Sequence, residues 1–475
     1  MPYIQEERQV NLFRKKDISN ALAESQKGGK LKRDLGAFDL TMLGIGAVIG
    51  TGIFVLTGAG ALKAGPALAV SFVIAAIACA FSALAYAEFA SMAPVSGSAY
   101  TYSYATLGEI IAWIIGWDLV LEYLFAVSSV SVGWSGYFQS LLGGFGIHFP
   151  DALTAAPGAV EGVTTYFNLP AFLIVMIIIT FLLSRGITES KRANNIMVII
   201  KVAVVLLFII VGAFYVKPSN WEPFAPFGFD GIFSAAALVF FAFIGFDAVA
   251  AAAEETRNPK RDLPIGLLTS LGICALLYVI VTLVMTGIVP YQEFAKDLSH
   301  PISLALQKAE QDWFAGVIDL GAIMGMTTVI LVMLYGQTRI FFSMSRDGLL
   351  PKAFSWVHPK YKTPYTSTWI IGTIAAFVGA LLPLDKLAEL VNIGTLFAFT
   401  VVSLGVIILR YTQPDFPRPF RCPGVPVIPA IAIFACLFLI SNLAVFTWIA
   451  FAVWFVIGLI IYFTYSRKHS LLNQQ

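Results

Sequence analysis

Long apolar stretches separated by short polar segments run through most of this chain. They predict twelve membrane-spanning helices, at residues 38–61, 66–91, 101–139, 168–185, 192–216, 230–256, 263–289, 312–345, 366–383, 386–409, 426–442 and 445–465. Most of the stretches approach or exceed the length of about 20 residues that a helix needs to cross a bilayer. They lack the strict apolar–polar alternation of barrel strands. The pattern therefore predicts an all-α membrane protein that resides in the lipid bilayer.

The composition agrees with this interpretation and argues against several classes of function. The 475 residues are 58% hydrophobic and only 12% charged, whereas soluble domains carry about 25% charged residues. The net charge of +2 does not indicate a nucleic-acid partner. The four cysteines are scattered, and the sequence shows neither a metal-ligand spacing nor a set of nucleophile and base. We therefore expect no enzyme, no metal and no bound cofactor.

Lysine and arginine are distributed unevenly among the predicted loops. If both termini are cytoplasmic, most of the 30 basic residues fall in the tails and the inner loops. The outer loops then hold only Lys63, Lys217, Lys296, Lys308 and Lys386. Because the inner loops of membrane proteins are enriched in basic residues, we predict that the N- and C-termini lie in the cytoplasm.

The first and sixth predicted spans share a pattern. Residues 36–39 open the first span and residues 228–230 open the sixth, and a glycine-containing interruption follows each. Five spans separate them, so the two halves of the chain face opposite ways, and interrupted helices in inverted repeats indicate a substrate site between the repeats. The predicted organisation is a basic cytoplasmic tail (1–35), a first repeat (36–225), a second repeat (226–412) and a last part (413–475). The last part holds a proline-rich run, expected to form an extended cytoplasmic connector, two more spans and the C-terminal tail.

The interruption in the first span has a composition suited to binding. Four glycines lie within residues 44–52, and each weakens a helix by up to about 1 kcal/mol relative to alanine. A break exposes N–H groups at the start of the outer half-helix and carbonyls at the end of the inner half. Amides of Gly50, Thr51 and Gly52 suit a carboxylate, while the carbonyl of Val48 suits an ammonium. With further carbonyls from residues 240–245, the two breaks can hold a zwitterion. Close packing between glycine-rich helices is the alternative.

Several longer motifs, in order along the chain, carry a resemblance to a known family. They are the glycine motif 44–54, the segments 87–89 and 94–100, the segment 254–259 with Pro264, the segment 345–351 and the proline-rich run 416–426. With these motifs the chain resembles the amino acid–polyamine–organocation (APC) superfamily, and within it the bacterial cationic amino acid transporter branch. The resemblance covers nearly the whole chain.

The resemblance implies a fold, a function and a site. The fold is of the LeuT type, a 5+5 inverted repeat with discontinuous helices 1 and 6. The function is secondary active transport of L-amino acids across the cell membrane by alternating access. The substrate carboxylate is then expected at the amides around Thr51 and Gly52, and the substrate amine at carbonyls around Val48, Phe241, Ala242 and Ile244.

A single lysine, Lys201, stands among aliphatic residues near the middle of the fifth span. It follows Arg192 by nine residues, about 14 Å along a helix and close to the centre of a hydrocarbon core about 30 Å thick. Such a lysine needs oxygen partners or must lose its proton. By the resemblance, it stands where proton-coupled members carry a lysine and sodium-coupled relatives bind sodium. We expect it to contact the Gly46 carbonyl and the eighth span near Thr327 and Thr328, and to couple transport to H⁺. A purely structural pairing is the alternative.

Carboxylates within the predicted spans are further candidates, because such groups usually face a cavity or a partner. Glu122 and Asp247 are expected to receive the side chain of a cationic substrate, to relay protons, or to make structural hydrogen bonds. Asp118 is expected to anchor a loop or a helix. Phe246 and Met333 are expected to wall the side-chain pocket, with ordinary packing as the alternative. A bulky Met333 favours small or neutral substrates.

Other acidic residues lie near the predicted cytoplasmic ends. We expect Glu88 and the pair Glu254 and Glu255 to gate the protein or to pair with arginines such as Arg346. Three functions stay open: proton-coupled transport, amino acid exchange without net proton movement, and a transport-inactive amino acid sensor. Neither the charge of the substrate nor the oligomeric state follows from the sequence.

Overall fold

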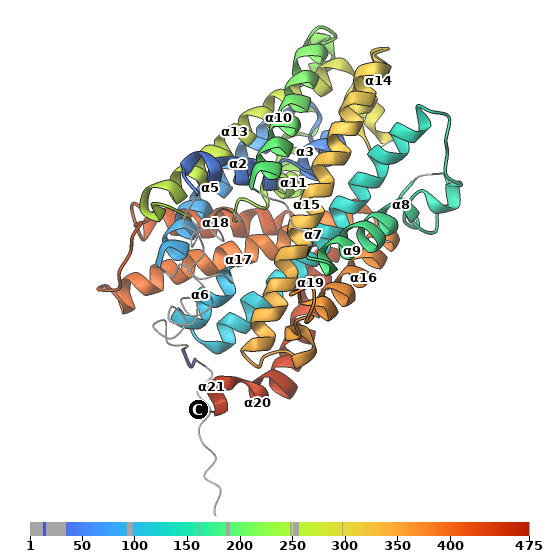
Figure 1. Ribbon diagram of the computed structural model, residues 1–475. Coiled ribbons are helices and arrows are strands. Elements are labelled where there is room, and N and C mark those ends of the chain that lie inside the picture. Colours follow the sequence, from blue (N-terminus) through green and yellow to red (C-terminus); the bar gives the residue numbers. More distant parts are fainter. Residues whose placement is uncertain are drawn as a thin grey trace, which may run out of the picture.

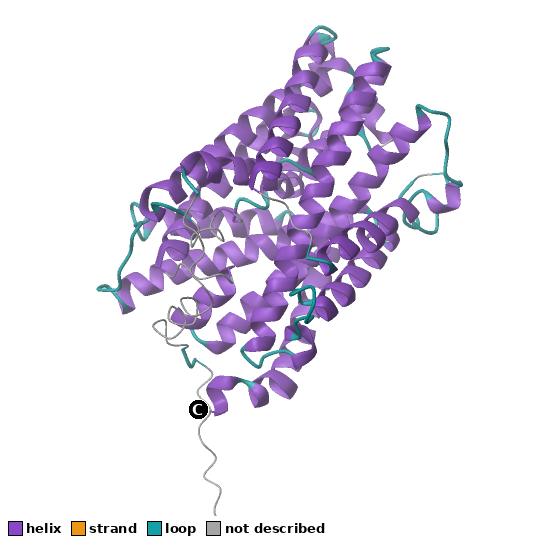
Figure 2. Cartoon of the chain, in the orientation of Figure 1, coloured by secondary structure: helices purple, strands orange, loops and turns teal. Residues whose placement is uncertain are grey.

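The computed structural model of the protein describes residues 13–15, 35–92, 98–160, 162–186, 191–247, 249, 256–296 and 298–474. These residues form helices joined by loops and turns, and no strand occurs among them (Figure 2). The prediction of an all-α protein is confirmed. Most of the N-terminal tail, motif residues 94–97, and Glu254 and Glu255 lie outside the described residues.

The predicted spans coincide with helices of the structure (Figure 1). These helices are α2 (Ala37–Val48), α3 (Thr51–Phe54), α4 (Leu56–Ala64), α5 (Leu68–Met92), α6 (Ser98–Thr106), α7 (Glu109–Gly143), α8 (Leu169–Leu173), α9 (Thr180–Ser184), α10 (Lys191–Ala213), α11 (Gly228–Val239), α13 (Pro259–Ile288), α15 (Asp312–Arg346), α16 (Tyr365–Leu381), α17 (Leu384–Thr412), α18 (Val427–Ser441) and α19 (Val445–Ile461). Among the described residues, seven helical segments are long and apolar enough to cross a membrane, and five shorter apolar helices accompany them. The chain is thus a multi-pass membrane protein, and the number of twelve passes stays a prediction.

Shorter elements extend or connect these helices. They are η1 (Gly65–Ala67), η2 (Asp151–Leu153), η4 (Pro218–Trp221), η5 (Phe240–Phe243), η7 (Tyr291–Lys296), α14 (Pro301–Lys308), η8 (Lys352–Ser355), α20 (Arg467–His469) and α21 (Leu471–Gln474). Two further elements are π-helical: η3 (Ile174–Ile179) lies between α8 and α9, and η9 (Tyr462–Ser466) follows α19.

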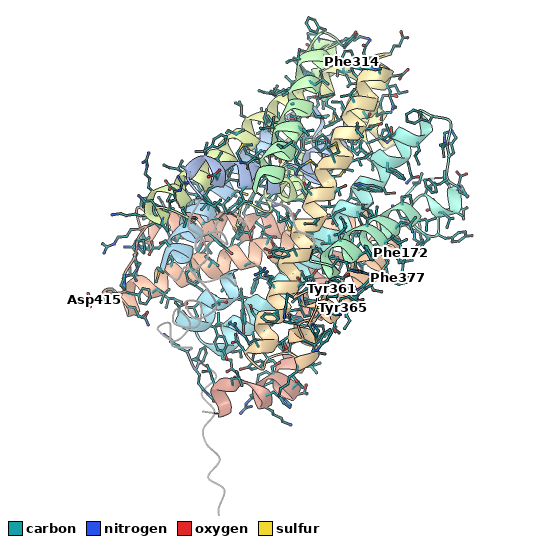
Figure 3. The ribbon with its side chains drawn as sticks, in the orientation of Figure 1. Phe172, Phe314, Tyr361, Tyr365, Phe377 and Asp415 are labelled. Atoms are coloured by element: carbon teal, nitrogen blue, oxygen red, sulfur yellow. The ribbon has the colours of Figure 1, made fainter. Side chains whose placement is uncertain are left out.

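The long helices α7 and α15 pack against each other through the middle of the molecule (Figure 1). In this view α10 and α13 lie on one side of the pair, and α8, α9 and α16 lie on the other. Phe172 of α8 contacts Phe377 of α16, with ring centroids 5.1 Å apart (Figure 3). The helices connect two ends of the molecule, one that carries α14 and one that carries the C-terminus.

The third predicted span begins differently from the prediction. Instead of one helix from residue 101, α6 ends at Thr106 and α7 begins at Glu109. Gly108 between them has a φ of +105°, a conformation that suits glycine and few other residues. A Cβ at this position would also lie 2.7 Å from the backbone of Phe13. The glycine therefore ends one helix and admits the N-terminal segment.

The first and sixth predicted spans are both interrupted after a helix of 12 residues. Ile49 is extended between α2 and α3. After α11 the chain tightens into the 3₁₀ turn η5, and Gly245 then takes a φ of +106°. Both interruptions lie at the glycine-containing positions noted in the sequence.

The two interrupted segments run antiparallel and in close contact. A Cβ at Gly231, near the start of α11, would lie 2.5 Å from the Lys63 carbonyl oxygen at the end of α4. A Cβ at Gly245 would lie 3.0 Å from the Ala47 carbonyl oxygen near the end of α2. Residue numbers increase along one segment in the direction in which they decrease along the other. This is the arrangement that inverted repeats produce.

The proline-rich connector between α17 and α18 is folded around Arg418, which is not a feature of an extended linker. The guanidinium donates hydrogen bonds of 2.7–2.9 Å to the carbonyls of Leu409, Gln413, Pro414 and Phe416. Its Nε lies 3.2 Å from Glu88 Oε1 of α5, and both side chains are 1% exposed. Asp415, at the edge of the molecule in Figure 3, belongs to the same turn of chain.

Glu88 is the common acceptor at this point. It also accepts hydrogen bonds of 2.9 and 2.7 Å from Arg410 of α17 and one of 2.6 Å from the Cys422 amide. Its arginine partners are therefore Arg410 and Arg418, and not Arg346, the example expected from the sequence. Burial raises the pKa of the Cys422 thiol to about 12, so this thiol stays protonated and unreactive.

Candidate functional site

A small cavity, called here the central cavity, lies where the two interruptions meet. Its volume is about 20 Å³, about the space of one water molecule. It is lined by Ala47, Val48, Gly50, Thr51, Gly52, Ala126, Val130, Phe241, Ile244, Val329 and Met333. Seven residues singled out from the sequence thus surround one point: Val48, Gly50, Thr51, Gly52, Phe241, Ile244 and Met333. A cavity this small must widen before it admits an amino acid.

Of the four remaining lining residues, Ala47 belongs to the glycine motif of the first span, and the other three were not anticipated. Ala126 and Val130 come from α7, and Val329 comes from α15. An aliphatic residue in an apolar helix carries no signal that it faces a cavity. Their contribution is an apolar wall opposite the interruptions.

On the α3 side, the central cavity faces backbone donors. Because α3 begins at Thr51, the N–H groups of Thr51, Gly52 and Ile53 have no carbonyl of their own helix to bind. The start of a helix also carries a partial positive charge. This side of the cavity is suited to a carboxylate.

Carbonyl oxygens of both interruptions converge on one tyrosine of α13. The Tyr278 hydroxyl lies 2.9 Å from the Val48 oxygen and 3.0 Å from the Ala242 oxygen. Its single proton serves only one of them fully at a time, and each carbonyl oxygen has two lone pairs. Both oxygens therefore retain capacity for an ammonium. Nothing in the sequence around Tyr278 marks it for this role, because its proximity to the interruptions depends on how α13 packs.

Glycine is required at position 52 for the contact between the interruptions themselves. A Cβ at Gly52 would lie 2.2 Å from the Ala242 Cα and 2.9 Å from its nitrogen. At Gly50 the nearest atom would be a Val329 methyl at 3.4 Å, an ordinary contact. The close packing considered as an alternative for these glycines therefore does occur at Gly52, beside the cavity.

Lys201 of α10 is buried, with 1% of its surface exposed. Its Nζ donates a hydrogen bond of 2.7 Å to the Gly46 carbonyl near the end of α2. The stem of the side chain passes Gly325 of α15, where a Cβ would lie 3.2 Å from its Cγ and Cε. Thr327 donates to the Ile323 carbonyl and accepts from Trp134. Lys201 therefore joins the first interrupted segment to α10 and passes along α15.

The acidic residues singled out from the sequence are not among those that line the central cavity. Glu122 and Asp247 are buried and interact electrostatically, but neither lines the cavity. Phe246 does not line it either and packs on Phe399, with ring centroids 5.1 Å apart. Both carboxylate oxygens of buried Asp118 are without a hydrogen-bond partner among the described residues. The roles expected for these residues stay predictions.

Comparisons with known proteins cover nearly the whole chain. The family described as amino acid permease matches residues 35–465. A branched-chain amino acid permease of Bacillus subtilis (strain 168) is 66% identical, with 98% of this chain and 99% of that protein covered. A methylthioribose transporter of the same strain is 53% identical, with 98% and 100% covered. The vacuolar cationic amino acid transporter 2 of Arabidopsis thaliana is 41% identical, with 85% and 64% covered.

Proposed function

Since this chain belongs to the amino acid permease family, within the APC superfamily, we propose that it moves neutral L-amino acids across the cell membrane by alternating access, driven by protons. Membership of this family makes the chain a transporter and not an enzyme. The substrate, the coupling ion and the mechanism are the parts that we infer from the site.

The observation that carries the proposal is the pairing of donors and acceptors around the central cavity. The amides at the start of α3 lie on one side, and the carbonyls of Val48 and Ala242 meet near Tyr278. A free amino acid presents a carboxylate and an ammonium on one carbon, so one molecule satisfies both sets. No charged side chain is among the residues that line this cavity in the described part of the chain. Backbone dipoles are therefore the recognition elements.

The lining favours an uncharged aliphatic side chain. Met333, Val329, Ala126 and Val130 are apolar, and Phe241 and Ile244 complete the wall. A cationic side chain would lose its hydration here without gaining a partner. A relative at 66% identity is a branched-chain amino acid permease, which supports the same substrate class. Leucine, isoleucine and valine are the substrates that we propose.

Methylthioribose is the competing substrate that the comparisons raise, because a relative at 53% identity is a methylthioribose transporter. This thiosugar has hydroxyl groups but neither a carboxylate nor an ammonium. It would leave the α3 amides without a charged partner. The central cavity therefore favours an amino acid.

Lys201 is the group that we propose for proton coupling. The Nζ–Gly46 hydrogen bond of 2.7 Å links α10 to the end of α2, directly before the interruption. Burial penalises the charged form of an ammonium, so opening of the surrounding helices to one side or the other changes the ease of proton loss. When the proton leaves, the neutral amine that remains is a weaker donor than the ammonium and holds α2 less firmly. Proton release and movement of the interrupted segment are thereby linked.

Uptake into liposomes that contain no amino acid tests the proposal. We expect radiolabelled leucine to accumulate when the outside is acidic relative to the inside. Unlabelled isoleucine and valine should compete, whereas arginine and methylthioribose should compete at least about tenfold less well, a difference of about 1.4 kcal/mol. Amino acid amides and decarboxylated amines should not compete for the central cavity.

The same vesicles separate the alternatives. An exchanger gives uptake only when amino acid is also present inside. A sensor gives binding without uptake under either condition. Equal competition by methylthioribose and leucine would contradict the zwitterion site, and equal competition by arginine would contradict the proposed substrate class.

A further inference from the structure

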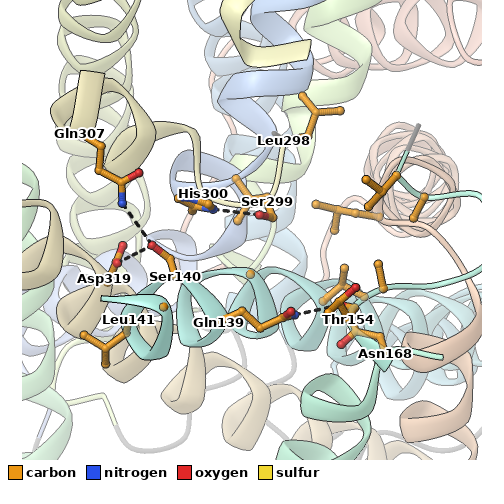
Figure 4. A pocket seen from close by; sticks show the side chains of 18 of the residues that line it. Gln139, Ser140, Leu141, Thr154, Asn168, Leu298, Ser299, His300, Gln307 and Asp319 are labelled. Atoms are coloured by element: carbon orange, nitrogen blue, oxygen red, sulfur yellow. Dashed lines mark hydrogen bonds between the residues drawn. The ribbon is translucent and has the colours of Figure 1, made fainter. Parts of the chain in front are cut away.

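A second and larger cavity, called here the outer cavity, lies beside α14 (Figure 4). Its volume is about 1440 Å³, far more than one amino acid requires. Its wall is formed by the second half of α7, the loop after it, the segment before α14, and the first turns of α15. The function proposed for the central cavity does not explain this second cavity.

The outer and central cavities follow the same helices. On α7, Val130 lines the central cavity and Val132 lines the outer one, a separation of about 3 Å along the helix axis. On the first interrupted segment, Gly52 faces the central cavity and Val55 faces the outer one. The outer cavity therefore neighbours the central cavity along these two elements.

Hydrogen bonds join the elements that line the two cavities. The Trp134 indole donates to the Thr327 hydroxyl at 2.9 Å. The Tyr137 hydroxyl donates to the Phe54 carbonyl at 2.5 Å. These bonds join α7 to α15 and to the end of α3. A substrate that reaches the central cavity from this side must first occupy the outer cavity.

One buried carboxylate in the outer cavity has an unused acceptor. Asp319 of α15 is 2% exposed, and its Oδ2 accepts a hydrogen bond of 2.7 Å from Ser140 (Figure 4). Oδ1 accepts none from the described residues. The Ser303 hydroxyl lies close enough to interact with this carboxylate, but it donates its hydrogen bond to the Ala315 carbonyl at 3.1 Å. His300 is an ionisable neighbour. A buried carboxylate oxygen without a donor is costly.

We propose that Asp319 and Ser140 form an entry site for the ammonium group of an incoming amino acid. An ammonium has three donors and no acceptor. It can therefore serve Oδ1 of Asp319 together with the second lone pair of the Ser140 oxygen, whose first lone pair accepts from Gln307 at 3.4 Å. Apolar residues of the same cavity, among them Leu141, Val317 and Leu320, contact the aliphatic part. The identity of the ligand rests on the proposed function, whereas recognition of an ammonium rests on Asp319 alone.

This site differs chemically from the central one because it does not bind the carboxylate of the ligand. A primary amine with a branched aliphatic chain, 3-methylbutylamine, is therefore the probe. The reporter is a cysteine introduced by Gly316→Cys. Gly316 lines the outer cavity one helical turn before Asp319, and a Cβ there meets no atom within 4 Å. The four natural cysteines are buried. A membrane-impermeant anionic thiol reagent applied from outside therefore modifies the introduced cysteine selectively.

We expect 3-methylbutylamine to slow modification of the introduced cysteine, and 3-methylbutanol and sodium chloride to leave the rate unchanged. Asp319→Asn should raise the amine concentration for half protection at least about tenfold, as expected for loss of one charge-assisted hydrogen bond. The matched control is Asp312→Asn, which neutralises another acid of the same cavity and should leave protection intact. If Asp319→Asn does not fold, Ser140→Lys supplies a tethered ammonium and should abolish protection.

Three results would overturn the entry site: no protection in the parent, undiminished protection in the folded variant, or equal protection by sodium. Equal loss of protection in Asp312→Asn would also overturn it, because the effect would then be one of total charge. Gly50→Ala, which narrows the central cavity without a backbone collision, should leave protection unchanged. Protection without proton-driven leucine uptake would refute the proposed function and leave the ammonium site standing. Proton-driven uptake without protection would refute the ammonium site and leave the proposed function standing.

Discussion

At the scale of single residues, the two glycines of the first interruption have different tasks. A Cβ at Gly52 would collide with the Ala242 backbone, whereas one at Gly50 would make ordinary contact with Val329. Gly52 therefore lets two backbones approach each other, and Gly50 leaves room within the cavity. A substitution at Gly52 tests the packing of the interruptions together with binding, so Gly50 gives the cleaner test.

Gly52→Ala should separate the two interruptions and destabilise the protein by about 1–3 kcal/mol, the usual cost of overpacking. Gly50→Ala should fold normally, but its ratio of leucine affinity to alanine affinity should be lower than in wild type. The added methyl group narrows the cavity and disfavours the larger substrate. Thermal unfolding and ligand-induced thermal shifts of both variants check this. Equal stability of Gly52→Ala and wild type would contradict the contact with Ala242.

Met333 is the other residue whose size should set selectivity. It lines the central cavity with 7% of its surface exposed, and a methylene group in such a pocket is worth about 1–3 kcal/mol of discrimination. Met333→Ser should raise affinity for larger amino acids, arginine included, relative to alanine by about tenfold. Met324→Ser makes the same change on α15 away from both cavities and should leave the ratio unchanged. An unchanged ratio in Met333→Ser would remove Met333 from the side-chain pocket.

At the scale of elements, the connector is held to the helix ends by a buried charge cluster. Glu88 of α5 contacts Arg410 of α17 and Arg418 of the connector. Burial lowers the pKa of Arg418, and Glu88 opposes that effect. The guanidinium stays protonated at accessible pH, so removal of Glu88 would leave positive charge without its partner.

Glu88→Gln should therefore lower the free energy of unfolding by about 3–5 kcal/mol, as for a broken buried ion pair. The matched control is Glu293→Gln. Glu293 lies 3.5 Å from Lys308, and the two side chains are 30% and 44% exposed, so its loss should cost about 0–1 kcal/mol. Thermal unfolding in detergent compares the two variants. Equal midpoints would show that the buried cluster does not hold the connector.

At the scale of the whole molecule, the parts that could be predicted are those with a local cause. Glycine spacing marked both interruptions, and the depth of Lys201 marked its contact with Gly46. Tyr278 and Arg418 escaped prediction because their partners come from other elements, brought near only by tertiary packing. Asp319 is a carboxylate within a predicted span, the kind of group that usually faces a cavity or a partner, yet it was not singled out from the sequence. The separation of α6 from α7 depends on the positive φ of Gly108, which a helix-favouring run of neighbours concealed.

The antiparallel contact couples the two interrupted segments mechanically. Movement of one segment must change its contacts with the other, because Gly231, Gly245 and Gly52 leave almost no space between the backbones. Lys201 holds the end of α2 at this contact. Proton loss at Lys201 is thus the event that we propose to connect the driving force to the rearrangement.

The most direct test measures leucine uptake into liposomes without internal amino acid, with and without an inward proton gradient, for wild type and Lys201→Ala. The account predicts that the gradient drives accumulation by wild type and has no effect on Lys201→Ala. Leucine exchange should persist in the variant, because the central cavity is built mainly from backbone groups and apolar side chains. Accumulation by Lys201→Ala that follows the gradient at the wild-type rate would contradict the account, as would wild-type uptake that ignores the gradient.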